Sequence, residues 1–104
     1  MKTYIKKDVV ELVSKKLGED AGDFRLISKI VNITFNSLRE LMIKEDEESR
    51  IEIRNFGVFE VKKTKAKPKA RNPKTNQVIF VPPRRKTHFK PGKMLQDALK
   101  KPIK

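Results

Sequence analysis

The chain has 104 residues, and its 26 lysine and arginine residues against 13 aspartate and glutamate residues give a net charge of +13. A chain of this length forms one small domain with a thin core, for which oligomerisation is a common remedy. The absence of cysteine excludes disulfides and zinc–thiolate sites, and no apolar run is long enough to span a membrane. The first residues are charged too early for a signal peptide, so we expect a soluble intracellular protein.

The charge is unevenly distributed along the chain. Residues 1–60 hold 11 basic and 12 acidic side chains, whereas the 12 charged residues between Glu60 and Asp97 are all basic. A nearly neutral half joined to a basic half indicates a scaffold that carries an anion-binding surface. Nucleic acid is the anion that we expect.

Apolar residues at helical spacing predict two helices in the first half of the chain. The first extends from Lys6 to Leu17 and ends at Gly18, although its start carries no strong capping signal. The second follows a start signal in which Asp20 caps the helix and Asp23 adds negative charge to the first turn. It continues for about five to six turns to Met42. Its wide apolar stripe is more than the first helix can cover, which indicates a partner chain.

An acidic connector, residues 44–50 (KEDEESR), follows the second helix and is interpreted as a solvated loop. Alternating apolar and polar residues then predict a strand over 51–54 and another that begins at Val58. The apolar side chains at the base of this second strand share a face with Lys63. One face of the strand is therefore expected to be core at its base and basic farther along.

Residues 62–75 are the most informative stretch of the chain. Seven of these 14 residues are lysine or arginine and none is acidic. Five of the basic residues recur at every second position, which is one face of an extended strand, and two prolines argue against a helix. We therefore predict a projecting basic ribbon that ends in a turn at 71–76, with a strand at 77–81 returning along it. The residues on the basic face are Lys63, Lys65, Lys67, Lys69 and Arg71.

The end of the chain completes a pattern of two helices, three strands and one helix, which is an α+β domain. Pro82 and Pro83 end the returning strand, and a last helix is predicted over residues 91–100, with Pro91 in its first turn. Three basic residues between them are expected to extend a phosphate-binding track, although a basic loop that only aids solubility is the alternative. They are Arg84, Arg85 and Lys86.

The aromatic residues and the single histidine are given no chemical role. Four phenylalanines are predicted to be core residues and not platforms for base stacking, which requires exposed aromatics on a basic face. His88 alone builds neither a metal site nor a catalytic triad. The four phenylalanines are Phe56, Phe59, Phe80 and Phe89.

Three motifs in this half of the chain resemble the DNA-binding signature of the HU/IHF family of bacterial histone-like proteins. They are Phe56-Gly57-x-Phe59, Arg71-Asn72-Pro73-x-Thr75 and Phe89-x-Pro91-Gly92-Lys93. With the two-helix half, the resemblance covers nearly the whole chain. The sequence departs from the family pattern at Ala70 and Asn76, where glycine is common, in the longer acidic connector and in a few extra C-terminal residues.

The resemblance implies an IHF-like fold: two N-terminal helices, a three-stranded antiparallel sheet with a long protruding β-arm, a short C-terminal helix, and an intertwined dimer. Residues 1–104 would form a single domain, with a helical dimerisation half at 1–48. The sheet, the arm (about 62–77) and the last helix would occupy 49–104. A homodimer is expected, and a heterodimer with a paralogue is the other arrangement.

The function that the resemblance implies is an architectural protein of the bacterial cytoplasm that organises and condenses the nucleoid. Two basic arms would lie in the minor groove of double-stranded DNA, and Pro73 would intercalate and bend it, with low sequence specificity. No catalytic residue, metal, cofactor, membrane or small-molecule substrate is expected. Charge and resemblance together give the expected DNA-binding residues, which are Lys63, Lys65, Lys67, Lys69, Arg71, Asn72, Pro73, Lys74, Thr75, Arg84, Arg85, Lys86 and Lys93.

Two other classes of function are compatible with part of this sequence. An RNA-binding or ribosome-associated basic protein has a similar composition, but an Arg-Asn-Pro tip on a two-stranded arm fits a minor groove better than a single strand. An enzyme acting on nucleic acid is not supported, because Glu60 is the only acid near the basic block and metal-dependent phosphoryl chemistry needs a carboxylate cluster. Taken singly, Pro73 is also consistent with an ordinary turn, and the lysines with an edge strand protected from aggregation.

Overall fold

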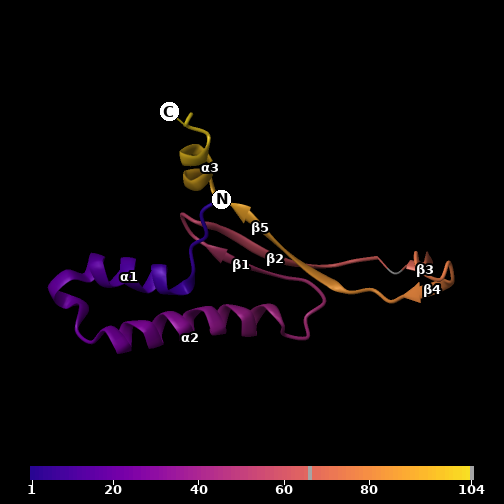
Figure 1. The fold of residues 1–104 in the computed structure, drawn as a ribbon, viewed down its shortest axis with the longest axis horizontal. Coiled ribbons are helices and arrows are strands. Elements are labelled where there is room, and N and C mark those ends of the chain that lie inside the picture. Colours follow the sequence, from indigo (N-terminus) through magenta and orange to yellow (C-terminus); the bar gives the residue numbers. More distant parts are fainter. Residues whose placement is uncertain (66, 104) are drawn as a thin grey trace. The chain divides into compact units, whose positions relative to one another are not determined.

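A computed structural model of the protein describes residues 1–65 and 67–103. The chain divides into two compact units, Met1–Lys44 and Glu45–Lys104. In the described residues, the first unit contains helices only, and the second contains the strands and the last helix (Figure 1). No helix in the described parts of the chain has the length and apolar character needed to cross a membrane.

The first unit is a pair of helices that lie alongside each other (Figure 1). Helix α1 spans Lys6–Leu17 and helix α2 spans Phe24–Met42, so both predicted helices are confirmed. The buried residues Val10, Ile27 and Val31 form the core between them. This core is small for 44 residues. The apolar residues that α2 leaves exposed are Phe24, Leu26, Ile30, Ile33, Phe35 and Leu41.

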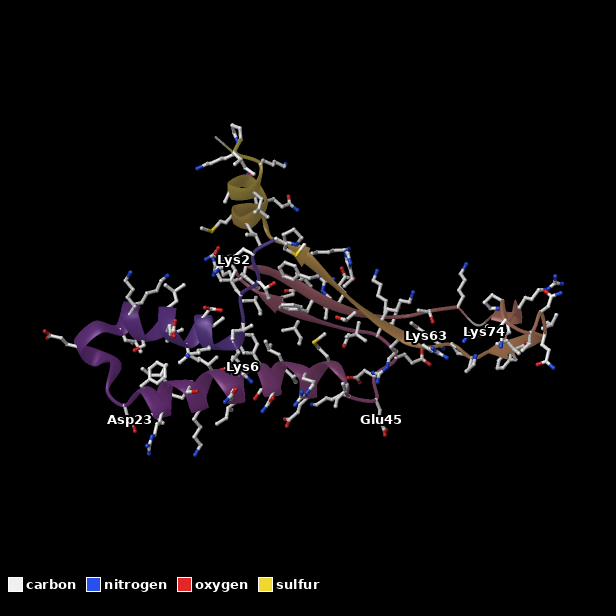
Figure 2. The ribbon with its side chains drawn as sticks, in the orientation of Figure 1. Lys2, Lys6, Asp23, Glu45, Lys63 and Lys74 are labelled. Carbon is white, nitrogen blue, oxygen red and sulfur yellow. The ribbon has the colours of Figure 1, made fainter. Side chains whose placement is uncertain are left out.

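Helix α1 starts at Lys6 as predicted, whereas the cap of α2 is not the aspartate expected from the sequence. The Asp8 carboxylate accepts the N–H of Ile5, the residue that precedes α1, at 2.7 Å, which satisfies a donor at the end of the helix. Asp23, labelled in Figure 2, caps α2 by accepting the N–H of Arg25 at 2.9 Å. The prediction that Asp20 caps this helix is wrong, because residues 18–21 form a separate 3₁₀ turn, η1, before α2.

The second unit is built on a three-stranded antiparallel sheet of order β1-β2-β5. The strands are β1 (Ser49–Ile53), β2 (Gly57–Lys63) and β5 (Arg85–Pro91). Alternation along β2 places Phe59 and the buried Val61 on one side of the sheet, its apolar face, and Val58, Glu60 and Lys62 on the other side, which we call the polar face.

Aromatic packing holds the apolar face of this sheet together. The rings of Phe59 and Phe89, which are cross-strand partners, have centroids 4.8 Å apart, and Phe56 lies 5.3 Å from Phe89. A side chain at Gly57 would bring its Cβ to 2.5 Å from the carbonyl oxygen of Lys90 and 2.7 Å from the Phe89 ring. The β1–β2 turn therefore requires glycine at this position, and Asn55 within the turn adopts a positive φ of 66°.

The last strand and the last helix correct two predictions. The segment 85–91 was not predicted as a strand, yet it pairs with β2 along its whole length. Pro91 ends this strand and does not begin the helix. Gly92 instead caps α3 (Lys93–Leu99), and its N–H donates to the carbonyl of Phe56 at 2.8 Å.

The predicted basic arm is a separate two-stranded hairpin. Its strands are β3 (Lys67–Arg71) and β4 (Val78–Val81), and their pairing shifts by one residue between Lys67 and Ala70. The prediction of one uninterrupted basic strand is therefore wrong, because β2 ends at Lys63 and the shift breaks the alternation. We call residues 64–84 the arm.

Candidate nucleic-acid interface

The tip of the arm is a tight turn that presents Pro73 to solvent. The N–H of Asn72 donates to the carbonyl of Gln77, and the N–H of Asn76 donates to the carbonyl of Asn72, each at 2.7 Å. The side-chain oxygen of Asn72 accepts the N–H of Lys74 at 2.9 Å, which closes a local turn around the proline. Pro73 is exposed, and the hydrogen bonds on both sides of it fix its position.

The two unusual residues at the tip fit this geometry. Asn76 adopts a φ of 61°, a conformation that asparagine tolerates better than most residues other than glycine. Ala70 pairs with Ile79 within the hairpin. The departures from the family pattern therefore leave the turn at Pro73 intact.

Most of the predicted basic residues of the arm are exposed. Lys63, Lys65, Arg71 and Lys74 all have exposed side chains, and Figure 2 marks Lys74 on the turn of the arm. The backbones of Lys67 and Lys69 lie in β3, but their side chains fall outside the described part of the structure. The remaining predicted tip residue, Thr75, is also exposed.

Thr64 and Arg84 join the arm to the sheet. The Thr64 N–H donates to the carbonyl of Arg84 at 2.6 Å, and the Thr64 hydroxyl accepts the Arg84 N–H at 2.9 Å. These bonds continue the β2–β5 pairing one step beyond Lys63 and Arg85. The Arg84 side chain is left exposed beside the root of the arm.

The acidic connector also reaches the root of the arm. The Glu47 carboxylate lies 3.6 Å from the Lys63 ammonium, and the Glu48 carboxylate accepts the Lys63 N–H at 3.3 Å. The guanidinium of Arg85 donates to the carbonyl of Asp46 at 3.1 Å. The connector is exposed to solvent, as predicted, but it also contacts the root of the arm, which the sequence did not indicate.

The polar face of the sheet carries a second group of lysines. Lys62 and Lys86 are cross-strand partners, and Lys90 lies on the same face, opposite Val58. All three lysines are exposed. Of these three lysines, only Lys86 was predicted from the sequence to bind DNA. The alternating positions that start at Lys63 lie on the opposite face of β2 and therefore did not include Lys62. The polar face is formed by positions 60 and 62 of β2 and by positions 86, 88 and 90 of β5. Predicting a strand over 85–91 would have shown that Lys62, Lys86 and Lys90 share this face.

Glu60 lies among these lysines and is nearly buried. Its two carboxylate oxygens contact different strands, one at 2.8 Å from the Lys90 ammonium and the other at 3.3 Å from the Lys62 ammonium. The hydrogen bond from Lys90 and then the contacts with Lys62 lower the pKa of the Glu60 carboxyl, against the opposing effect of burial. The carboxylate is therefore charged throughout the physiological range and fixes both lysines.

Lys93 stands apart from the arm, and Phe80 lies on the arm but is not buried. Lys93 is the first residue of α3 and follows the end of β5 that is remote from the arm. Phe80, which was predicted to be a core residue, lies on β4 with 62% of its surface exposed, so that prediction is wrong. Phe59 and Phe89 are half-buried, whereas Phe56 is 45% exposed although its ring packs against Phe89, so the prediction that Phe56 is a core residue is also wrong. Among the described residues, no group of three histidine, aspartate or glutamate side chains is placed to hold a metal ion.

A helical pair, a three-stranded sheet and a two-stranded basic arm with a proline at its tip define a class of small basic α+β proteins. Residues 4–100 match the family described as "Bacterial DNA-binding protein". The chain therefore belongs to this bacterial DNA-binding protein family, and the resemblance to HU and IHF is confirmed.

Similar proteins agree with this assignment. The chain is 35% identical to the DNA-binding protein HU of Thermotoga maritima over 95 residues, which is 91% of this chain and 98% of that protein. It is 32% identical to the integration host factor subunit alpha of Haemophilus influenzae over 101 residues, 97% of this chain and 98% of that protein. The fold matches that of HU in an Anabaena HU–DNA cocrystal structure, with a TM-score of 0.73, 25% identity, and coverage of 95% of this chain and 100% of that one. The predicted α+β fold class is confirmed.

Proposed function

We propose that this protein is an architectural DNA-binding protein that grips duplex DNA with basic arms and bends it, without catalysing a reaction. The single observation that carries the proposal is the exposed Pro73 at the hydrogen-bonded tip of a basic hairpin, in a chain of the bacterial DNA-binding protein family. The fold match to a HU–DNA complex supports the choice of duplex DNA as the partner.

Pro73 is the wedge in this mechanism. An apolar side chain that enters a base step unstacks it at a cost of about a few kcal/mol, and the bent duplex then contacts more protein. Proline suits this role because its ring is rigid and apolar and because it has no N–H group to leave unsatisfied. The hydrogen bonds of Asn72 fix the turn, so little conformational entropy is lost when the tip enters the groove.

The basic residues supply the affinity by contacting phosphates and the minor groove. We assign the tip contacts to Arg71, Asn72, Lys74 and Thr75, and the wedge to Pro73. The phosphate contacts along the arm, beside its root and at α3 are assigned to Lys63, Lys65, Lys67, Lys69, Arg84, Arg85, Lys86 and Lys93. The exposed Lys62 and Lys90 extend this surface across the polar face of the sheet.

A dimer brings two arms to one duplex. The apolar residues that α2 leaves exposed and the small core of the first unit support association with a second chain, either an identical one or a paralogue. We further propose that residues 1–104 act as a single domain in the cytoplasm, on the nucleoid, with low sequence specificity. An arm in the minor groove reads mostly A·T against G·C pairs, and the shape and deformability of the duplex supply the rest of the discrimination.

The salt dependence of binding tests the proposed contacts. If a dimer makes six phosphate contacts, the slope of log K against log salt is about −5 for duplex DNA. Lys65→Gln, which removes one contact from each arm, is expected to make the slope shallower by about two, since the slope changes by about 0.9 per contact. Lys15→Gln on α1 has the same change in charge and serves as the control.

The measurement is a fluorescence anisotropy titration of a labelled duplex at a series of salt concentrations. An equal slope for both variants contradicts the assignment of the arm. Tighter binding to duplex RNA of the same length than to DNA contradicts the proposed partner.

A further inference from the structure

The acidic connector is longer than the family pattern and is placed against two residues assigned to DNA binding. Lys63 and Arg85 are cross-strand partners at the point where β2 and β5 leave the sheet for the arm. Three consecutive residues of the connector contact this pair: Asp46 through its carbonyl, and Glu47 and Glu48 through their carboxylates. Figure 2 marks Lys63 at this end of the sheet and Glu45 at the start of the connector.

The contacts are of a kind that a phosphate can replace. The side chains of Glu47 and Lys63 are 80% and 48% exposed, so their attraction is weakened by water and by salt. Glu60 provides a contrast, because its side chain is only 11% exposed and holds two lysines at once. The carboxylate of Glu60 is therefore a fixed part of the sheet. The carboxylates of the connector are exposed, and a DNA phosphate can take their place.

We propose that the acidic connector is an internal competitor for DNA phosphate at the root of the arm. In the free protein Glu47 and Glu48 occupy the surroundings of Lys63, and DNA binding replaces them with a phosphate group. Lys63 is already paired with a carboxylate in the free protein. When a DNA phosphate binds Lys63, fewer salt anions are released from the protein, and less affinity is gained, than when a phosphate binds a lysine without such a partner. The connector thus lowers affinity at low salt and makes binding less dependent on salt. This inference rests on the proposed function.

The test compares wild type with the double variant Glu47→Gln/Glu48→Gln. Glutamine keeps an oxygen that can accept the Lys63 N–H, so the loop retains its hydrogen bond and loses only its charge. The control is Glu11→Gln/Glu19→Gln, which has the same change in charge at exposed positions of the helical unit. Each protein is titrated against one labelled duplex at several salt concentrations, and circular dichroism checks that it is folded.

We expect the connector variant to bind about two- to tenfold more tightly than wild type at low salt, the range given by an exposed ion pair in each of two arms. The gain should shrink as salt rises, and the control should show less than half of it. In a Lys63→Gln background the gain should fall to that of the control, because the charge for which the connector competes is absent.

The outcomes separate this inference from the function on which it rests. If wild type does not bind duplex DNA, the proposed function fails. If wild type binds and the connector variant matches either wild type or the control, the connector does not compete and the inference is overturned. Weaker binding by the connector variant also overturns it, because the carboxylates would then support the arm instead of competing with DNA.

Discussion

At the scale of single residues, Glu60 shows how the sheet determines the state of one carboxyl group. It lies on β2 among basic residues, and its two ion pairs bridge to Lys62 on the same strand and to Lys90 on β5. The alternation of the strand places it on the polar face, opposite in direction to Phe59 and Val61. The Glu60 carboxylate holds the ammonium groups of Lys62 and Lys90 in place and offsets the repulsion between them.

The lowered pKa of Glu60 predicts a pH dependence of stability. A group whose pKa is lower in the folded state contributes stability above its unfolded pKa, and this stability is lost as the pH falls through the folded pKa. Glu60→Gln should therefore reduce the free energy of unfolding at pH 7 and have progressively less effect as the pH falls below the unfolded pKa and through the lowered folded pKa. Urea unfolding at a series of pH values measures this. Parallel pH profiles for the two proteins would show that the ion pairs contribute no stability.

At the scale of elements, the helices and the arm tip were predictable and the third strand was not. The bounds of α1 and α2 follow from apolar residues at helical spacing, a signal that depends only on the chain itself. Strand β5 (RKTHFKP) has few apolar residues and ends in a proline, so it lacks the alternating pattern of a half-buried strand. It becomes recognisable as a strand only when Phe89 is paired with Phe59, and that pairing is not local in sequence.

The same reason limits what the sequence could predict about the site. The turn around Pro73 is built from adjacent residues, so its motif could be read directly. The roles of Lys62 and Lys90 depend on which face of the sheet they occupy, and the contacts of the acidic connector with Lys63 join residues 15 positions apart. Charge composition alone led to the interpretation of this connector as solvated, because composition does not show what lies beside a loop.

Strands β4 and β5 provide a matched comparison of two phenylalanines. Phe89 on β5 packs against two other rings, whereas Phe80 on β4 is mostly exposed. We expect Phe89→Ala to lower the free energy of unfolding by about 2–4 kcal/mol and Phe80→Ala by less than about 1 kcal/mol. Denaturant unfolding followed by circular dichroism measures both. Equal losses would mean that Phe80 is buried in the assembled protein.

At the scale of the whole molecule, the small core makes stability depend on association. In the described parts of the chain, the buried hydrophobic residues are Val10, Ile27, Val31 and Val61, which is few for a domain of this length. We expect a dimer without a populated folded monomer, so the melting temperature should rise with protein concentration. Equilibrium sedimentation combined with thermal melts at several concentrations measures this. A folded monomer at micromolar concentration would contradict the account.

The bending of DNA by the arm tip is the central claim, and one measurement tests it most directly. The end-to-end distance of a short duplex labelled with a dye at each end is measured by energy transfer as wild type or Pro73→Ala is added. We expect wild type to shorten the distance strongly, and Pro73→Ala to bind but to shorten it less, because the lysines still hold the DNA and the wedge is missing. If wild type binds without shortening the distance, the protein coats DNA and does not bend it. If Pro73→Ala bends the duplex as strongly as wild type, the bend does not depend on the wedge.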